Sequence, residues 1–471
     1  MPTPTSPTAT RHDWLRLVGG DKGLAALASK TLDGIILEAL TERASDAPLL
    51  GRSDAACWDI RPLHAAADPL AVRAAVAEDI AGGASSIALK LATPGDFGLP
   101  PRYDALAAAL DGVPLERVQV SLISGDQYFG AVQVLMALWE RTGRNARDIR
   151  AGVHADPLGT LARTGALEMG LWPTLELFGQ FVSVNCEPWP HVRLLLADGT
   201  LYHDAGASEV QELAAMLATV VDYLRVLDFE DVAPEEVFRH LTVGLAADAD
   251  LFATIAKLRA ARLLLARLGE AMGTPAATSH VEFWVTTSQR MLASRVVHNN
   301  ILRNAIAALG AALGGADTIT VLPHTWALGE PDAAARRLAR NTQLLMAKES
   351  RLARVLDPGA GSGHITALTE AFAARAWALF QEIEASGGMA RALLSGKMQE
   401  AIADMVARRD KELVEGRLAI VGLTAFTAEE GERLAPTSHP PAAPIERAET
   451  RVTALPVRRL SAALEVKEAR S

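Results

Sequence analysis

The chain has 471 residues, 49% of them hydrophobic and 22% charged, a composition typical of soluble globular proteins. Its formal net charge of -10, without any long basic run, argues against binding to nucleic acid or to an anionic membrane. Two cysteines, Cys57 and Cys186, are too few for a disulfide framework or a thiolate metal site. No apolar run reaches the roughly 20 residues of a membrane span, and the start MPTPTSPTATRHDW lacks a secretory signal. We therefore expect a soluble, cytoplasmic protein.

Residues 1–50 are predicted to form an N-terminal extension. Residues 1–12 are rich in Pro and Thr and are predicted to be disordered, whereas the amphipathic pattern from Asp13 to about Leu50 predicts helices. Because this segment precedes the repeating pattern of the main body, we expect it to pack on that body or to contact a partner.

Residues 51–330 alternate short β-like runs with Ala/Leu-rich runs of helical period, as in the βα units of a parallel sheet. The expected strands are 85–92, 117–124, 150–156, 181–188, 193–198, 240–248, 280–288 and 318–327. About eight strands over this length predict an α/β fold of the (β/α)8 TIM-barrel type. An open doubly wound sheet stays the alternative, because the count can be one strand off.

Residues 331–435 are predicted to be C-terminal helices that complete the barrel domain, and residues 436–471 an extended tail rich in Pro and Ala. The stretch VLDPGAGSG (355–363) resembles the nucleotide loop of S-adenosylmethionine-dependent methyltransferases. The residues before it have a helical period rather than that of a strand, so we predict a helix stop and a turn there.

The stretch GTLYHDAGASEVQEL (199–213) places Tyr202 and His203 directly before a helix. Ser208 and Gln211 form a capping-box pattern, which predicts that the helix begins at Ser208. Tyr202 and His203 are therefore expected in a loop between a strand and a helix, on the face that carries the active site in barrels. A structural role for His203, with its ring nitrogens satisfied, stays open beside a functional one.

Arg262 falls on the apolar stripe of the predicted helix LFATIAKLRAARLLLARL (251–268). A buried guanidinium needs an anion, which is either a ligand's phosphate or carboxylate, or an internal acid. His298 and His324 are isolated, and no metal-ligand spacing or GxSxG motif occurs, so we expect no metal site.

Several segments carry a family resemblance: YHDAGASEVQEL (202–213), IAKLRAAR (255–262), NNILRNAIAALGAALGGADTITVLP (299–323), RRLARNTQLLMAKESRLARVLDP (336–358) and AWALFQEIEASGGM (376–389). From about Asp13 to Glu465 the chain resembles the acyl-CoA mutase family, and methylmalonyl-CoA mutase in particular. The resemblance implies a (β/α)8 barrel in an adenosylcobalamin-dependent isomerase that interconverts methylmalonyl-CoA and succinyl-CoA.

The chain departs from the catalytic members of this family at the residues that hold the substrate. In WDIRPLHAA, Leu63 stands where the family carries a tyrosine and Pro62 where it carries a glutamine. The segment HADPLGTLARTG (154–165) replaces another glutamine-bearing segment, and Arg295 stands in place of a further glutamine. The family's Asp-x-His-x-x-Gly cobalamin motif does not occur, so no cobalamin-binding domain is expected.

These departures resemble the non-catalytic small subunit of a heterodimeric methylmalonyl-CoA mutase, in which Tyr202, His203, Arg262, Arg295 and Leu63 would be a vestigial acyl-CoA site. The resemblance implies that this chain alone is inactive and binds no cofactor, and that the large catalytic subunit is its partner and holds adenosylcobalamin. A GTPase chaperone is a further expected partner. Leu63, Trp284 and Trp326 would fill the channel for acyl-CoA.

Two alternatives remain from the sequence. The chain could be a split acyl-CoA mutase barrel that binds acyl-CoA and works with a separate cobalamin-binding chain. The methyltransferase suggested by VLDPGAGSG is the other alternative.

Overall fold

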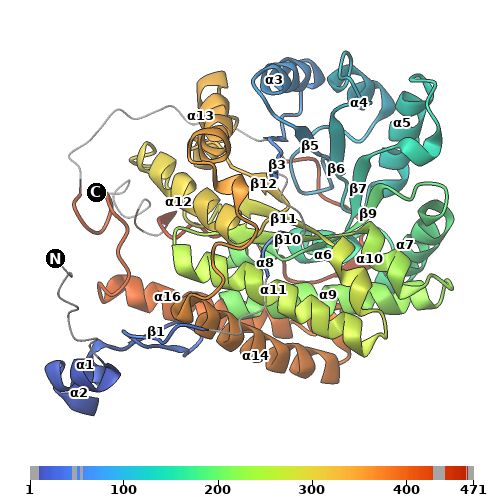
Figure 1. The fold of residues 1–471 in the computed structure, drawn as a ribbon. Helices are drawn as coiled ribbons and strands as arrows, with labels where there is room; N and C mark the ends of the chain where they lie inside the picture. Colours follow the sequence, from blue (N-terminus) through green and yellow to red (C-terminus); the bar gives the residue numbers. More distant parts are fainter. Residues whose placement is uncertain are drawn as a thin grey trace, which may run out of the picture.

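Parallel strands form the centre of the computed structural model, which describes residues 10–44, 50–52, 57–427, 437, 441–462 and 464 (Figure 1). The central strands are β3 (Asp59–Ile60), β4 (Leu63–His64), β5 (Ser86–Lys90), β6 (Gln119–Ile123), β7 (Ala151–Ala155), β9 (Val192–Asp198), β10 (Leu241–Ala247), β11 (Glu282–Thr287) and β12 (Thr318–Thr320). Every residue of β5, β7 and β10 is buried, as expected for parallel strands that helices cover.

The sheet closes on itself through one interrupted strand. Its order is β3-β12-β11-β10-β9-β7-β6-β5-β4, and all neighbours are parallel. Only Arg61 and Pro62 separate β3 from β4, so the two edges of the sheet are halves of one strand. The predicted TIM-type barrel of eight strands is therefore confirmed, and the open sheet is wrong.

Two of the predicted strand positions need correction. Residues 181–188 lie mostly in helix α7 (Leu171–Cys186) and not in a strand, because Leu171, Leu175, Phe178 and Val182 form one buried helical stripe. The strand at residues 59–64 was absent from the prediction, because Pro62 removes a backbone donor in its middle. The two errors cancel in the count of eight.

Helices surround the barrel and cover its outer face (Figure 1). They are α3 (Pro69–Ala81), α4 (Tyr103–Ala109), α5 (Tyr128–Glu140), α6 (Pro157–Thr164), α7, α8 (Thr200–Ala205), α9 (Glu209–Asp228), α10 (Pro234–His240), α11 (Leu251–Ala271), α12 (Asn299–Leu313) and α13 (Ala333–Leu344). Short 3-10 turns lie at Ala146–Asp148, Pro275–His280, Trp326–Leu328 and Leu352–Arg354, and a π-turn at Leu345–Glu349. Among the described helices, none combines the length and apolar character that a membrane crossing requires.

The helices after residue 360 pack directly on the barrel helices. Helix α14 (Gly363–Ala385) lies against α9 and α11, while α15 (Gly388–Leu394) and α16 (Lys397–Val414) continue around α9. The stretch 355–363 is a turn before α14, as predicted: Asp357 pairs with Arg259 and accepts a hydrogen bond from the Leu50 amide. These contacts within the chain account for the Asp-Pro turn, so a bound nucleotide is not needed to explain it.

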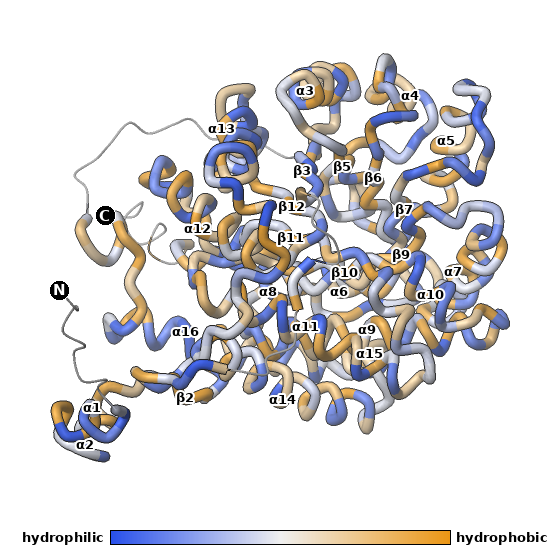
Figure 2. The backbone as a smooth tube through the Cα atoms, in the orientation of Figure 1, coloured by the Kyte–Doolittle hydropathy of each residue, from blue (hydrophilic) through white to orange (hydrophobic). Residues whose placement is uncertain are grey.

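The first two helices form an arm that stands away from the barrel (Figure 1), whereas the hairpin after them contacts it: Ser208 Oγ donates to Asp33, and Leu37 packs against the core. Helices α1 (Arg11–Leu17) and α2 (Gly20–Leu27) have no buried residue, although both contain hydrophobic positions (Figure 2). The predicted helical pattern ends there: strands β1 (Ser29–Lys30) and β2 (Ile36–Leu37) form a hairpin whose turn contains Gly34 at φ 80°. Residues 1–9 and 45–49, which the predicted disorder and helices include, lie outside the described residues.

Candidate functional site

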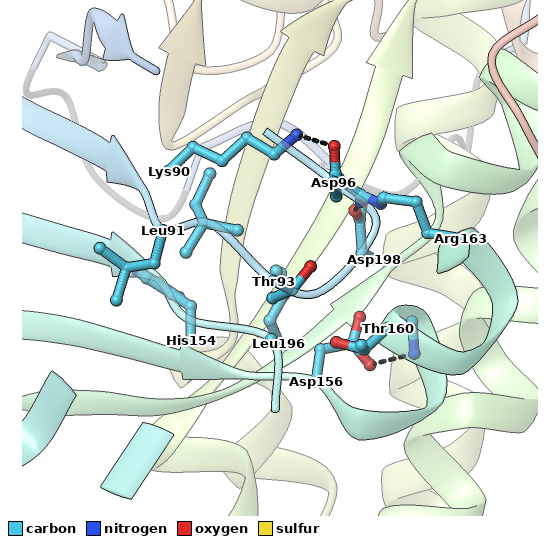
Figure 3. A pocket seen from close by; sticks show the side chains of 13 residues that line it. Lys90, Leu91, Thr93, Asp96, His154, Asp156, Thr160, Arg163, Leu196 and Asp198 are labelled. Atoms are coloured by element: carbon cyan, nitrogen blue, oxygen red, sulfur yellow. Dashed lines mark hydrogen bonds and ion pairs between the residues drawn. The ribbon is translucent and has the colours of Figure 1, made fainter. Parts of the chain in front are cut away.

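A cavity of about 290 Å³ lies at the C-terminal ends of the barrel strands. This is the end at which (β/α)8 proteins carry their active sites. Leu63, Trp284 and Trp326 all line it, so they narrow the channel without filling it. A polar recess of about 30 Å³ adjoins the cavity and shares with it the charged residues Lys90, Asp96, Arg163 and Asp198 (Figure 3).

Two ion pairs form the polar wall of the cavity. Lys90, the last residue of β5, pairs with Asp96 at 2.7 Å between Nζ and Oδ1. Arg163 on α6 pairs with Asp198, the last residue of β9, at 2.7 Å between Nη2 and Oδ2. Burial lowers the pKa of Lys90 to about 8, although Asp96 acts in the opposite direction. The wall therefore carries charge that is compensated from within the chain.

The end of β7 brings an imidazole and a carboxyl group into the polar recess. His154 has a φ of 47°, and among the described residues neither of its ring nitrogens has a hydrogen-bond partner. Burial lowers the pKa of His154 to about 3, so its ring is neutral. Asp156 caps α6 by accepting from the Gly159 amide, and Tyr223 Oη donates to it at 2.5 Å. Burial raises the pKa of Asp156 to about 7.

Residues 449–461, which we call the strap, cross the mouth of the cavity. Strand β13 (Thr450–Arg451) pairs with β8 (Ala166–Leu167), and Leu455, Pro456 and Val457 line the cavity. Four strap amides donate to carbonyls around the rim: Val452 to Gly165 (2.9 Å), Leu455 to Ala162 (2.8 Å), Arg458 to Asp204 (2.8 Å) and Leu460 to Arg290 (2.9 Å). The tail, which the sequence predicts only as an extended arm, therefore crosses the end of the barrel where a substrate would enter and forms part of the cavity wall.

Tyr202 and His203 do not line this cavity. They lie in the short helix α8 rather than in the predicted loop, and both side chains are fully buried. Thr200, Leu201 and Asp204 are the residues of α8 that line the cavity. The helix start predicted at Ser208 is confirmed, with both hydrogen bonds of the capping box present. Helix α8 thus turns Tyr202 and His203 away from the barrel axis.

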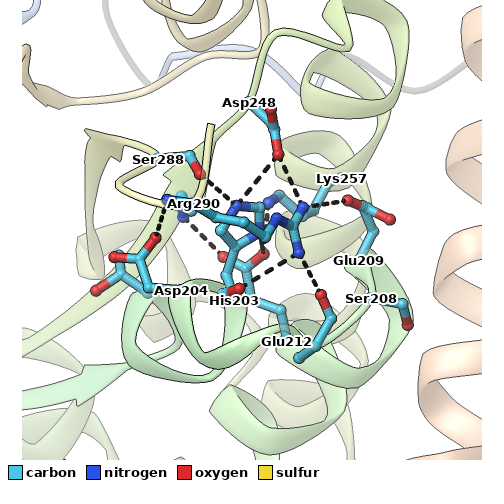
Figure 4. Close-up of polar contacts among 12 residues, drawn as sticks. His203, Asp204, Ser208, Glu209, Glu212, Asp248, Lys257, Ser288 and Arg290 are labelled. Atoms are coloured by element: carbon cyan, nitrogen blue, oxygen red, sulfur yellow. Dashed lines mark hydrogen bonds and ion pairs between the residues drawn. The ribbon is translucent and has the colours of Figure 1, made fainter. Parts of the chain in front are cut away.

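His203 belongs to a buried charge network outside the cavity (Figure 4). Its Nδ1 lies 3.2 Å from Glu212 Oε2, and its Nε2 lies 2.8 Å from Ser288 Oγ. Lys257 Nζ donates to the same Glu212 oxygen at 2.5 Å. Burial acts to raise the pKa of Glu212, but Lys257 and His203 outweigh it and bring the pKa to about 2. The order Ser288–His203–Glu212 resembles a nucleophilic relay, but Ser288 is only 1% exposed, so no substrate reaches it.

A second group of charges ties this network to the strap. Arg290 pairs with Asp248 at 2.8 Å and donates to the Ala207 carbonyl at 2.6 Å. Asp204 accepts from the amide and the side chain of Gln289, and burial raises its pKa to about 6. These contacts order the loop after β11, on which the strap rests.

The comparisons with known proteins match most of the chain. The family model described as methylmalonyl-CoA mutase matches residues 101–467. A methylmalonyl-CoA mutase small subunit from Streptomyces virginiae is 40% identical over 448 residues, which cover 89% of this chain and 71% of that protein. The chain belongs to the methylmalonyl-CoA mutase family.

Both kinds of mutase subunit are among the relatives. The small subunit from Propionibacterium freudenreichii subsp. shermanii is 34% identical over 395 residues, or 84% of this chain and 60% of that protein. The large subunit from Streptomyces virginiae is 30% identical over 342 residues, or 70% of this chain and 45% of that protein. Methylmalonyl-CoA mutases are isomerases, and this chain is a mutase subunit.

The five residues that were predicted to form a vestigial acyl-CoA site lie in different parts of the structure. Leu63 lines the cavity, and Arg295 is half-buried in the segment between β11 and α12, at the same end of the barrel. Arg262 lies at the opposite end: its Nη2 donates to the Gly315 carbonyl at 2.6 Å and lies 3.3 Å from the Asp317 carboxylate, just before β12. Its anion is thus the internal acid, one of the two alternatives left open.

We did not predict from the sequence that one cavity brings together Lys90, Asp96, Arg163 and Asp198. They come from β5, the loop after it, α6 and the end of β9. The one usable signal was position, because Lys90 lies near the end of the predicted strand 85–92 and Asp198 at the end of the predicted strand 193–198, on the active-site face. Among the described residues, no three or more His, Cys, Asp or Glu side chains are arranged to hold a metal ion.

Proposed function

We propose that this chain is the non-catalytic small subunit of a heterodimeric methylmalonyl-CoA mutase. In this proposal it stabilises the large catalytic subunit, which holds adenosylcobalamin and interconverts methylmalonyl-CoA and succinyl-CoA. The identity of 40% to a small subunit, against 30% to a large subunit of the same organism, supports this assignment.

The observation that carries the proposal is the mouth of the barrel, which the strap crosses and whose charges are compensated from within the chain. Lys90–Asp96 and Arg163–Asp198 occupy the polar wall, and the strap narrows the entrance on one side. A cavity of about 290 Å³ is at the lower limit for a drug-sized ligand, and a CoA thioester with its nucleotide and pantetheine arm is larger. Leu63 adds neither the hydroxyl nor the aromatic wall that the family's tyrosine supplies. The mouth is therefore unsuited to holding a CoA thioester for turnover.

The residues at the mouth do not fit a bound cobalamin. His154, the histidine of the polar recess, is fully buried inside the barrel and offers no nitrogen to a ligand at the surface. The strap occupies the rim above it. We therefore assign adenosylcobalamin to the large subunit, and derive no chemical step for this chain.

The arm formed by α1 and α2 is the proposed contact with the large subunit. Leu17 is 86% exposed and Leu27 52% exposed, and neither helix has a buried residue. Two amphipathic helices with an uncovered apolar face are stable only when that face is covered. An arm that stands away from its own barrel can cover a partner of the same fold. A GTPase chaperone and a cytoplasmic location remain further parts of the proposal.

The test is mutase activity with adenosylcobalamin and methylmalonyl-CoA, for the chain alone and mixed with a large subunit. We expect no turnover alone, and an active one-to-one complex after mixing. Leu17→Asp should weaken the complex about tenfold or more, whereas Leu70→Asp, an exposed leucine on α3, should not. Turnover with a separate cobalamin-binding chain and no large subunit would instead establish the split-barrel alternative and overturn the proposal.

A further inference from the structure

Lys90 is an amine held inside a cavity rather than against solvent. It is 8% exposed and ends β5, and its Nζ lies 2.7 Å from Asp96 Oδ1 and 3.5 Å from the centre of the Phe97 ring. It lines both the cavity of about 290 Å³ and the polar recess (Figure 3). A purely structural ion pair has no need of open volume beside it. The cavity that Lys90 lines can hold a small molecule.

Arg163 faces the same space from α6. Its Nη2 pairs with Asp198, while its Nη1 lies 3.8 Å from Asp96 Oδ2. A distance of 3.8 Å is an ion pair and not a hydrogen bond, so this end of the guanidinium can still donate to a carboxylate oxygen. Asp96 lies between the two cations, which places an amine and a carboxylate-binding group at one cavity.

The electrostatic surroundings favour the uncharged amine more than those of a surface lysine do. Burial lowers the pKa of Lys90 to about 8, and Arg163 contributes in the same direction. The groups that face it are Asp96 and Asp198, with Asp156 in the recess and Asp204 in the cavity. Burial raises the pKa of Asp156 to about 7 and of Asp204 to about 6, so carboxyl groups that can give and take a proton near neutral pH are present.

We propose that Lys90 is a carbonyl-binding site, which forms an imine with a short-chain oxo acid whose carboxylate binds Arg163. The lone pair of neutral Nζ attacks the carbonyl carbon, the carbon–oxygen π bond breaks, and a proton passes from the nitrogen to the oxygen to give a carbinolamine. The hydroxyl then takes a proton from solvent and leaves as water, while the nitrogen lone pair forms the C=N bond of the protonated imine, so no oxidant or reductant is needed. The imine keeps its positive charge beside Asp96, so the ion pair of the unmodified chain is preserved. The volume of the cavity admits an oxo acid of this size and is too small for a CoA thioester.

The experiment traps the imine in the full chain alone, so it depends neither on the partner nor on the proposed function. The chain is treated with glyoxylate and sodium cyanoborohydride at pH 8, and modified lysines are located by peptide mass spectrometry. We expect Lys90 to react about tenfold or more faster than the exposed Lys22 and Lys411, because an ordinary surface amine is almost wholly protonated at that pH. Lys257, which is buried against Glu212, should stay unmodified and so report that the chain is folded.

The role of Arg163 is tested by comparing an aldehyde that carries a carboxylate with one that does not. Arg163→Met should slow labelling of Lys90 by glyoxylate about tenfold more than labelling by propionaldehyde, which has no carboxylate and so reports only the effect of the lost charge on the Lys90 amine. If this variant does not fold, excess acetate with the unaltered chain serves instead: it should slow the labelling of Lys90 and not that of Lys22. Labelling of Lys90 no faster than Lys22, or insensitive to both Arg163→Met and acetate, would overturn the proposal.

Discussion

The ion pair between Lys257 and Glu212 gives the sharpest test of whether the network around His203 is structural. Both side chains are essentially inaccessible to solvent, and Lys257 Nζ lies 2.5 Å from Glu212 Oε2. Glu212 Oε1 accepts from the Ala246 amide at 2.7 Å. Lys257→Met removes the ammonium group and leaves a buried carboxylate with His203 and one amide.

The magnitude can be worked out from the pKa of Glu212. Lys257 and His203, acting against burial, lower it from 4.5 to about 2, and each pKa unit corresponds to about 1.4 kcal/mol. A depressed folded-state pKa stabilises the fold above pH 4.5, and this stabilisation is lost as the pH falls through about 2. The shift corresponds to about 3 kcal/mol of folding free energy. This value agrees with the roughly 3–5 kcal/mol of stability that is lost when one partner of a buried ion pair is removed.

The assay is guanidinium chloride unfolding followed by far-UV circular dichroism at pH 7.5 and pH 5. We expect Lys257→Met to lose about 3 kcal/mol at pH 7.5. It should lose less at pH 5, where the isolated Glu212 takes up a proton. The double variant Lys257→Met/Glu212→Gln should regain most of the loss, and Lys411→Met, at an exposed position, should change stability by less than about 0.5 kcal/mol. An unchanged midpoint for Lys257→Met, or a double variant no better than the single one, would refute the reasoning.

Three further predictions concern other charged or covered positions. Asp156→Asn keeps the acceptor for Tyr223 and removes a carboxyl group whose pKa is raised to about 7. Because this raised pKa disfavours the folded state once the carboxyl group ionises, the stability of the wild type falls as the pH rises from about 4 to 7, whereas that of the variant does not. At pH 8 the variant should be more stable by up to about 4 kcal/mol, and identical pH curves would contradict this. Arg262→Met should cost about 2–3 kcal/mol in thermal unfolding, since it leaves Asp317 uncompensated, but should leave the activity of a mixed complex unchanged. Leu455→Asp should release the strap, seen as faster amide exchange across residues 450–460; protection equal to wild type would show that Leu455 does not hold it.

Local signals predicted the features that depend on neighbouring residues. Ser208 and Gln211 lie three residues apart and form their capping box as expected, and seven of the eight barrel strands are predicted by buried apolar runs. The first strand was missed at Pro62, where a proline argues against a strand, although the barrel tolerates it as the break between β3 and β4.

The site could not be predicted because its geometry depends on distant segments. A helix of six residues, α8, decides that Tyr202 and His203 turn away from the cavity, and no periodicity is visible in so short a stretch. Arg262 was correctly expected to need an anion, but the choice between a ligand and Asp317 depends on two strands of the closed barrel. Lys90 and Arg163 become neighbours only through tertiary folding.

The attachment of the strap has a consequence for how the protein is made. The Gly170 amide binds the Glu449 carboxylate across 279 residues of sequence, near the pairing of β8 with β13. On the ribosome, synthesis proceeds at roughly 5–20 residues per second, so the part of the chain that contains β8 emerges many seconds before the strap has been synthesised. Until the strap is made, the Ala162 and Gly165 carbonyls beside α6 lack the amides of Leu455 and Val452 that they bond in the finished molecule. A chaperone or a nascent partner subunit therefore meets a different surface at that end of the barrel than the finished molecule presents.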